Sequence, residues 1–84
     1  MTGKQHIAAI REILRDCGEN NDWGEKVCVV TYAGVETTIV LTTGNKVVVT
    51  DDECGLFDHI ETYAPFEVQG FYEALRDKYG RTDK

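Results

Sequence analysis

The fold is decided by residues 26–50, which read KVCVVTYAGVETTIVLTTGNKVVVT. Val, Thr, Ile and Tyr dominate this stretch, and these residue types favour β-strands. Two glycine-containing pairs, Ala33-Gly34 and Gly44-Asn45, interrupt it, and such pairs are typical of tight hairpin turns. The sequence therefore predicts a three-stranded antiparallel meander. Its strands are expected at Lys26–Tyr32, Glu36–Thr42 and Lys46–Thr50.

The two turns also predict how the strands pair. With a two-residue loop at each turn, the first hairpin places Cys28 opposite Ile39 and the second places Val40 opposite Val49. Because side chains alternate between the two faces of a sheet, one face then forms the floor for the helices. The opposite face is expected to carry five valines, namely Val27, Val29, Val40, Val47 and Val49.

This valine-rich second face has three possible explanations. An antiparallel sheet with one face in water normally alternates apolar and polar residues, and five valines on the wet face depart from that pattern. Either a helix covers this face, or a second copy of the chain covers it, or the valines are exposed. The second explanation would make the chain a homodimer that associates through this face.

A helix is predicted before the sheet, at residues 3–17. Thr2 and Gln5 have the spacing of a capping box, in which each side chain satisfies a backbone N–H of the other residue. Apolar residues then recur at helical spacing. We expect Gly18 to end the helix in the left-handed conformation.

A second helix is predicted directly after the sheet, at residues 52–62. Thr50 and Glu53 repeat the capping-box spacing. An apolar stripe follows at helical spacing. It consists of Leu56, Phe57, Ile60 and Tyr63.

A last helix is predicted to begin at Pro65, a residue common in the first turn, and to end at Gly80. Because glycine is unfavourable inside a helix, Gly70 leaves open the alternative that Phe66–Gln69 form a short strand and not part of this helix. The whole chain is thus expected to be a single α+β domain over residues 1–84, with the order α-β-β-β-α-α and helices packed on the meander. Residues 81–84 are expected to be a frayed tail.

Composition excludes several classes of function. The 84 residues include 15 Asp and Glu against 9 Lys and Arg, for a net charge of −6. This acidic balance disfavours direct binding to nucleic acid, because affinity for phosphates comes mostly from Lys and Arg. No apolar run reaches the ~20 residues of a membrane span, and the first residues lack the apolar stretch of a secretory signal. We therefore expect a cytoplasmic protein.

Acidic residues are concentrated in the second half of the chain. Residues 47–75 contain seven Asp and Glu and no Lys or Arg. These carboxylates are either a solvated, solubilising surface or a patch that attracts a basic protein surface. On the second interpretation the candidate binding residues are Asp51, Asp52, Glu53, Asp58 and Glu61. Trp23, the single tryptophan, is either a lid on the core or an exposed anchor for a partner.

Chemical function has little support in the sequence. The cysteines, Cys17, Cys28 and Cys54, match no zinc spacing and no disulfide framework. Cys54 and His59 are five residues apart, which on one helix does not place them on the same face. We therefore expect no metal site, no cofactor and no enzymatic activity, with a thiol enzyme at Cys54 as a remote alternative.

The predicted order of one helix, three strands and a helix resembles the double-stranded-RNA-binding domain in topology. That family grips phosphates with a lysine cluster at the start of the helix after the sheet, where this chain has Asp51-Asp52-Glu53. The resemblance therefore implies the fold and not the activity. The order with an additional helix and an acidic surface is also similar to some small phage anti-CRISPR proteins.

Two hypotheses of function follow. The leading one is a non-enzymatic inhibitor whose acidic residues occupy a basic surface that otherwise binds nucleic acid. The alternative is a homodimeric structural or regulatory subunit that associates through the valine-rich face.

Overall fold

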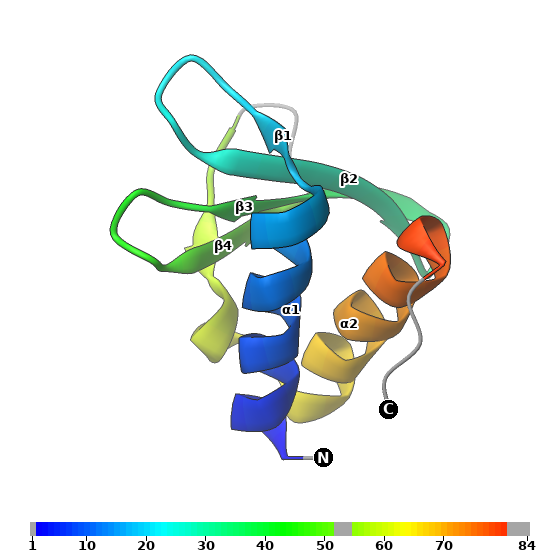
Figure 1. The fold of residues 1–84 in the computed structure, drawn as a ribbon. Helices are drawn as coiled ribbons and strands as arrows, with labels where there is room; N and C mark the ends of the chain where they lie inside the picture. Colours follow the sequence, from blue (N-terminus) through cyan, green and yellow to red (C-terminus); the bar gives the residue numbers. More distant parts are fainter. Residues whose placement is uncertain (1, 52–54, 81–84) are drawn as a thin grey trace.

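The protein has an N-terminal helix, a five-stranded antiparallel sheet and a C-terminal helix (Figure 1). This computed structural model describes residues 2–51 and 55–80. The strands follow one another across the sheet in chain order, so the predicted α+β class and the antiparallel meander are confirmed. Over the described residues the sheet has five strands and not the predicted three, because a two-residue strand is added at each edge. The elements are α1 (Gly3–Cys17), β1 (Glu19–Asn20), β2 (Lys26–Tyr32), β3 (Val35–Leu41), β4 (Val47–Thr50), β5 (Asp58–His59), the 3-10 helix η1 (Ile60–Thr62) and α2 (Pro65–Tyr79).

Helix α1 has the predicted bounds and the predicted capping box. The backbone N–H of Gln5 donates to Thr2 Oγ1 over 3.2 Å, and the N–H of Thr2 donates to Gln5 Oε1 over 2.7 Å. The predicted left-handed end is wrong, because Gly18 is extended, with φ −67° and ψ 153°. Gly18 instead allows a close approach, since a Cβ there would lie 2.5 Å from the carbonyl oxygen of Leu14.

Helix α2 begins at Pro65 and is followed by Gly80 in the left-handed conformation, with φ +63°, as predicted. Residues 66–69 lie inside this helix, so the alternative of a short strand is wrong. Gly70 is explained by packing. A Cβ at this position would lie 2.0 Å from Cε1 of Tyr32, so the glycine lets the tyrosine ring rest directly on the helix backbone.

The α-helix predicted at 52–62 is wrong over residues 55–59, and only the end of the segment is helical, as the 3-10 helix η1. Residues 55–57 are irregular, with Gly55 at φ +80°, and Asp58–His59 form the edge strand β5. Residues 52–54, which include the predicted capping residue Glu53, lie outside the described residues. The unpaired edge of β4 offers backbone partners to this segment, and the fully buried Ile60 fixes it on the core. Together these contacts outweigh a weak helical pattern.

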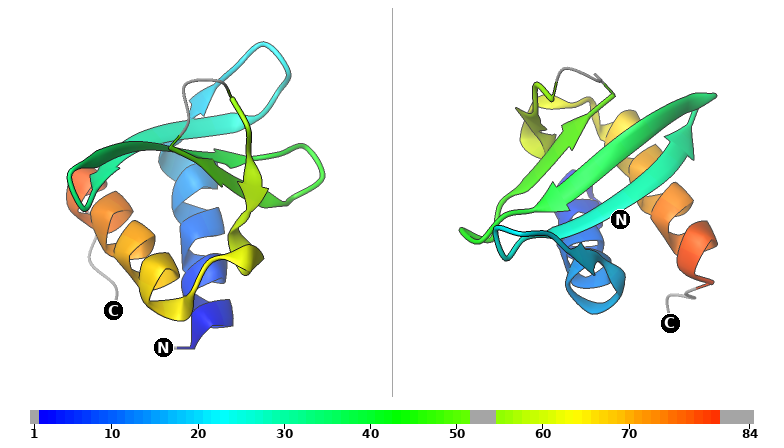
Figure 2. Two further views of the ribbon diagram at one scale, coloured as in Figure 1. Left: turned by 180° about the vertical axis from the view of Figure 1, so that it is seen from behind. Right: turned by 90° about the horizontal axis from the view of Figure 1, so that it is seen from above.

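Both helices pack on the same face of the sheet, which we call the inner face (Figure 2). No helix of the described residues lies on the opposite, outer face, so the explanation that a helix covers the valines there is wrong. The core between the helices and the inner face is closed by apolar side chains that are nearly or fully inaccessible to water. They include Ile10, Leu14, Ile39, Val47, Val49, Ile60 and Leu75.

The two hairpins differ in how well the sequence predicts them. In the first, Cys28 pairs with Ile39 as expected, and Ala33 and Gly34 both have the positive φ of a type I′ turn, +52° and +80°. In the second, Val40 pairs with Val48 and not with Val49, so the expected register is wrong by one residue.

The shift arises because the second loop has three residues, closed by the hydrogen bond from Thr42 N to Lys46 O. Asn45 takes the left-handed position of this loop, with φ +64°. As a consequence Val47 and Val49, expected on the outer face, are 0% and 1% exposed in the inner core. Their predicted place in a dimer face is therefore wrong, and Val48 takes it.

Candidate functional site

A row of three valines crosses the outer face of the sheet. Val27 on β2 lies opposite Val40 on β3, which lies opposite Val48 on β4. The row forms the floor of a groove of about 410 Å³, which we call the outer-face groove. It is lined by Asn21, Trp23, Glu25, Val27, Thr38, Val40, Val48 and Phe57.

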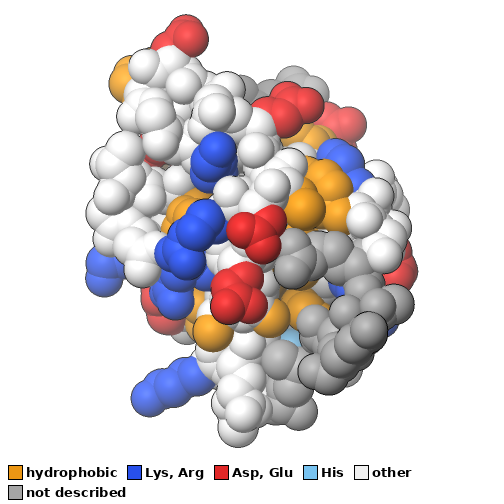
Figure 3. Space-filling model, viewed as in Figure 1, with side chains coloured by type: hydrophobic (Ala, Val, Ile, Leu, Met, Phe, Trp, Pro, Cys, Tyr) orange, Lys and Arg blue, Asp and Glu red, His pale blue; other side chains and the backbone are white. Residues whose placement is uncertain are grey.

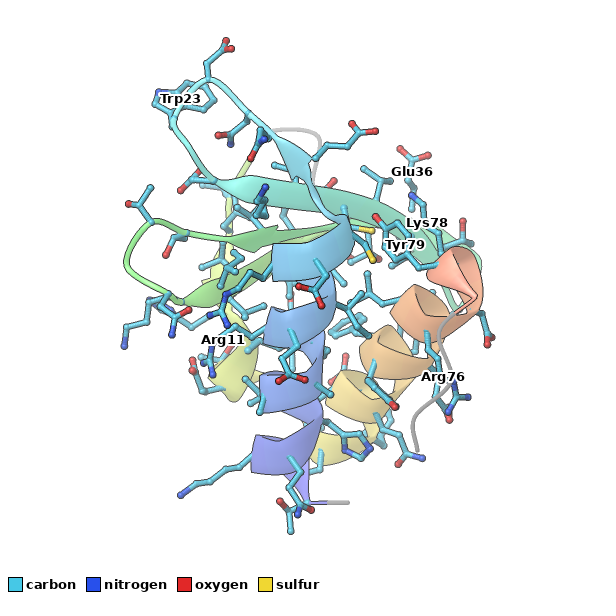
Figure 4. All side chains as sticks on the ribbon, in the orientation of Figure 1. Arg11, Trp23, Glu36, Arg76, Lys78 and Tyr79 are labelled. Carbon is cyan, nitrogen blue, oxygen red and sulfur yellow. The ribbon has the colours of Figure 1, made fainter. Side chains whose placement is uncertain are left out.

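One wall of the outer-face groove is Trp23, whose residue surface is 76% exposed. It lies in the loop between β1 and β2, which extends beyond the sheet in Figures 1 and 4. The tryptophan is therefore not the lid on the core that was one of its two interpretations. An indole with this exposure buries a large apolar area when a partner covers it.

The loop that carries Trp23 is fixed by Asn21. The side-chain oxygen of Asn21 accepts hydrogen bonds from the backbone N–H of Trp23, over 3.0 Å, and of Glu25, over 2.9 Å. Its amide donates to the carboxylate of Glu25 over 3.0 Å, and its own N–H donates to Glu25 O over 3.0 Å. Gly24 completes the turn with φ +77°. The exposed indole thus stands on an ordered turn, which lowers the entropy cost of binding.

The opposite wall is Phe57, in the irregular segment before β5. Phe57 is 42% exposed, and the preceding Leu56 is 72% exposed. Val40, on the floor between the two walls, is only 6% exposed although it belongs to the outer face. The outer-face groove is therefore a shaped apolar surface with aromatic side chains on both sides.

The predicted acidic site is only partly brought together. Asp51, Asp58 and Glu61 are exposed, whereas Asp52 and Glu53 lie outside the described residues. Burial raises the pKa of Tyr63 above its ordinary value, and the charges of Asp58 and Asp51 raise it further, followed by that of Glu67. These three carboxylates therefore share one neighbourhood around the Tyr63 hydroxyl, and Glu67 was not among the predicted binding residues.

Charge is distributed differently over α1. Figure 3 shows Lys and Arg side chains over this helix, with carboxylates beside them. Arg15 donates from Nη2 to Oδ1 of Asn45 over 2.8 Å, so this basic side chain also ties the helix to the β3–β4 loop. The face with α1 is thus of mixed charge. The described residues that line the outer-face groove, in contrast, include a single charged residue, Glu25, which is acidic.

Side chains that could bind a metal ion or take part in catalysis are few among residues 2–51 and 55–80. No three His, Cys, Asp or Glu side chains of this part come together in a way that could hold a metal ion. The hydroxyl of Tyr79 donates to Sγ of the buried Cys28 over 2.9 Å. Burial raises the pKa of Tyr79, and the hydrogen bond to Cys28 raises it further. Cys54 lies outside the described residues.

Two apolar residues of the outer-face groove, Val48 and Phe57, were missed by sequence reasoning, as were the polar lining residues Asn21, Glu25 and Thr38. The expected two-residue loop pairs Val40 with Val49 and so places Val48 on the face that packs against the helices, whereas the observed loop has three residues and pairs Val40 with Val48. Phe57 was assigned to a helix stripe. The signal that could have revealed it is Gly55, which favours irregular backbone in the middle of the predicted helix.

No protein-family model, no curated protein and no solved structure matches this chain. In addition, no helix of the described residues has the length and apolar character needed to span a membrane.

Proposed function

We propose that the chain is a non-enzymatic protein-interaction module whose binding surface is the outer-face groove. The observation that carries this proposal is Trp23, an indole 76% exposed on a turn held by four hydrogen bonds to Asn21 and Glu25. Tryptophan is among the residues that dominate binding energy in protein interfaces. The apolar floor of valines beside it supports the same interpretation, because the centres of interfaces are apolar and poor in charge.

The proposed partner is a basic protein surface with one apolar side chain that enters the outer-face groove. Carboxylates lie next to both walls, since Asp22 precedes Trp23 and Asp58 follows Phe57 along the chain. Glu25 lines the groove itself. With a net charge of −6, such a surface attracts a basic partner and repels an acidic one.

A surface that otherwise binds nucleic acid is the most specific form of this partner. Such surfaces are rich in Lys and Arg, and an acidic protein that covers them competes with phosphates for the same cations. Asp51, Asp58 and Glu61 are all exposed and belong to the stretch without Lys or Arg, so they would contribute to this competition.

Affinity capture with paired variants tests the proposal. The bait is the wild-type chain, and the two variants are Trp23→Ser and Phe66→Ser. Phe66 is the matched control because it is 70% exposed and lies in the first turn of α2, outside the groove lining. A protein captured by wild type and by Phe66→Ser, but lost with Trp23→Ser, supports the proposal. Equal capture by all three baits contradicts it.

A homodimer through the same face is the second candidate, and the aligned row Val27, Val40 and Val48 favours it. A second copy would have to place its own outer-face groove against that of the first, which would bring the acidic side chains of both copies together. Sedimentation at increasing concentration distinguishes the candidates. A dimer that Val48→Lys converts to a monomer supports the homodimer, and a monomer at every concentration contradicts it.

A further inference from the structure

The free edge of β2 is a second surface that the outer-face groove does not include. β3 pairs with β2 over its whole length, from Lys26 to Tyr32. On the other edge of β2, among the described residues, only β1 pairs with it, and β1 covers only Lys26 and Val27. The edge from Cys28 to Tyr32 therefore has no strand beside it within residues 2–51 and 55–80.

The direction of the backbone groups along this edge follows from two hydrogen bonds. The carbonyl of Glu25 accepts from Asn21 N, and the carbonyl of Val29 accepts from Lys78 Nζ. Because alternate residues of a strand direct their N–H and C=O to the same edge, Val29 and Thr31 both direct theirs away from β3. Together they offer two donors and two acceptors to an incoming strand.

A groove of about 630 Å³ runs beside this edge, with α2 as its other wall. Val29 and Thr31 line it from β2, and Ala74, Asp77 and Lys78 line it from the last turns of α2. Glu36, near the start of β3, also lines the groove, and Figure 4 shows Glu36 and Lys78 together at this end of the molecule. The ammonium of Lys78 donates to the edge carbonyl of Val29, which also accepts a long contact of 3.9 Å from the thiol of Cys28. A lysine over an edge strand is a common protection against unwanted strand pairing.

We propose that the β2 edge binds an extended basic segment of a partner protein by strand addition. The segment would run antiparallel to β2, exchange backbone hydrogen bonds with Val29 and Thr31, and displace the ammonium of Lys78 from the Val29 carbonyl. Backbone pairing of this kind supplies affinity, and the side-chain surroundings supply specificity. Among the described residues, the groove is lined by two carboxylates, Glu36 and Asp77, and by one ammonium, that of Lys78. Oδ1 of Asp77 also lies 4.0 Å from Nε of Arg76, which is outside the lining, so Glu36 is the carboxylate that favours basic side chains in the segment.

A second copy of the chain is a poorer occupant of this edge than a peptide segment. Two copies paired through β2 would each bring an α2 whose Ala74, Asp77 and Lys78 line the same groove. The two helices would then compete for one space, whereas a single extended segment has no helix to place there.

A capped heptapeptide of alternating lysine and valine is the probe, with amide chemical shifts and hydrogen exchange as the readout. We expect the amides of Val29 and Thr31 to become protected on binding. Thr31→Pro removes one edge donor without removing a bond to β3, and it should weaken the peptide about tenfold. Lys78→Met removes the ammonium from the Val29 carbonyl and should strengthen binding several-fold. The same peptide with glutamate in place of lysine should bind more weakly.

Two results would overturn the proposal. One is the absence of protection of the Val29 and Thr31 amides together with an unchanged peptide affinity in Lys78→Met. This result does not depend on Thr31→Pro, so it can be obtained even if that variant does not fold. The other is self-association of Lys78→Met in the absence of peptide, which would assign the edge to a second copy. Trp23→Ser should leave peptide binding unchanged, so failure of this proposal and failure of the outer-face groove are distinguishable.

Discussion

Val40 on β3 lies directly opposite Val48 on β4, and this pairing determines which valines face water. A register one residue away would turn Val47 and Val49 outward and Val48 inward. The observed register places Val49, 1% exposed, under the helices and leaves Val48 half-buried on the outer face. The outer-face groove exists only in this register.

Paired lysine substitutions test the register. Val49→Lys should abolish cooperative unfolding, because an unpaired charge buried in the core costs several kcal/mol, a large part of the total stability of a domain. Val48→Lys should retain a cooperative urea transition, since its ammonium can reach water. The register with a two-residue loop requires the opposite result, in which Val48→Lys unfolds the chain and Val49→Lys does not.

The first hairpin offers a stabilising substitution. Ala33 has φ +52°, a conformation that costs an L-residue with a Cβ about 1–2 kcal/mol, and Asn tolerates it better. Ala33→Asn should therefore raise the free energy of unfolding by about 1 kcal/mol in urea titrations. Gly34→Ala, at φ +80°, is the control and should lower it. A loss of stability in Ala33→Asn would show that the turn is not of type I′.

Gly70 should be intolerant of alanine although it lies inside a helix. Gly to Ala in a helix normally gains about 1 kcal/mol. Here the new Cβ would lie 2.0 Å from Cε1 of Tyr32, and overpacking of this kind costs about 1–3 kcal/mol. Gly70→Ala should thus lower the free energy of unfolding. In the Tyr32→Ala background the same change should become stabilising, and a double-mutant cycle without coupling would contradict this packing.

The titration of Tyr63 tests whether the carboxylates gather in space. Asp58 is the largest of the three charges that raise the pKa of Tyr63. Asp58→Asn should therefore lower this pKa toward its ordinary value, as read from the NMR signals of the Tyr63 ring across an alkaline titration. Glu61→Gln is the control, because Glu61 is not among the charges that raise it. An equal titration in wild type and Asp58→Asn would mean that the acids are dispersed.

Stability should fall at alkaline pH, because burial raises the pKa values of two tyrosines, Tyr63 and Tyr79. The pKa values of Tyr63 and Tyr79 are raised above 10 in the folded chain, so above that pH the folded state binds more protons than the unfolded state. The stabilisation that the two protonated tyrosines contribute is complete below pH ~10 and is lost as the pH rises through their pKa values in the folded state. Tyr79→Phe should flatten the decline of the free energy of unfolding between pH ~9.5 and ~11. An unchanged decline would exclude Tyr79 as its source.

Local patterns in the sequence predicted the parts of the fold that depend on neighbouring residues. The capping box at Thr2 and Gln5 fixed α1, and Pro65 and Gly80 bounded α2. The helix expected at 52–62 failed because its apolar residues serve other contacts. Ile60 fills the core, whereas Leu56 and Phe57 stay exposed, and the backbone between them pairs with β4.

The candidate site was less predictable because it depends on register and on loops. Trp23 was identified from composition, but its place beside the valine row requires the turn that Asn21 builds. Val48 could not be assigned from Gly44-Asn45, since that pair suits both a two-residue loop and the observed three-residue loop with left-handed Asn45. In the observed three-residue loop, Asn45 also accepts a hydrogen bond from Arg15 of α1, a contact between segments 30 residues apart that local pattern does not reveal.

The most direct test of the central claim is the dissociation constant of a captured partner for Trp23→Ser compared with Phe66→Ser. Loss of a tryptophan at the centre of an interface costs at least about 2 kcal/mol, which corresponds to roughly 30-fold in affinity. We expect Trp23→Ser to weaken the complex by that factor or more, and Phe66→Ser to bind as wild type does. Equal dissociation constants for the two variants would contradict the assignment of the outer-face groove as the binding surface.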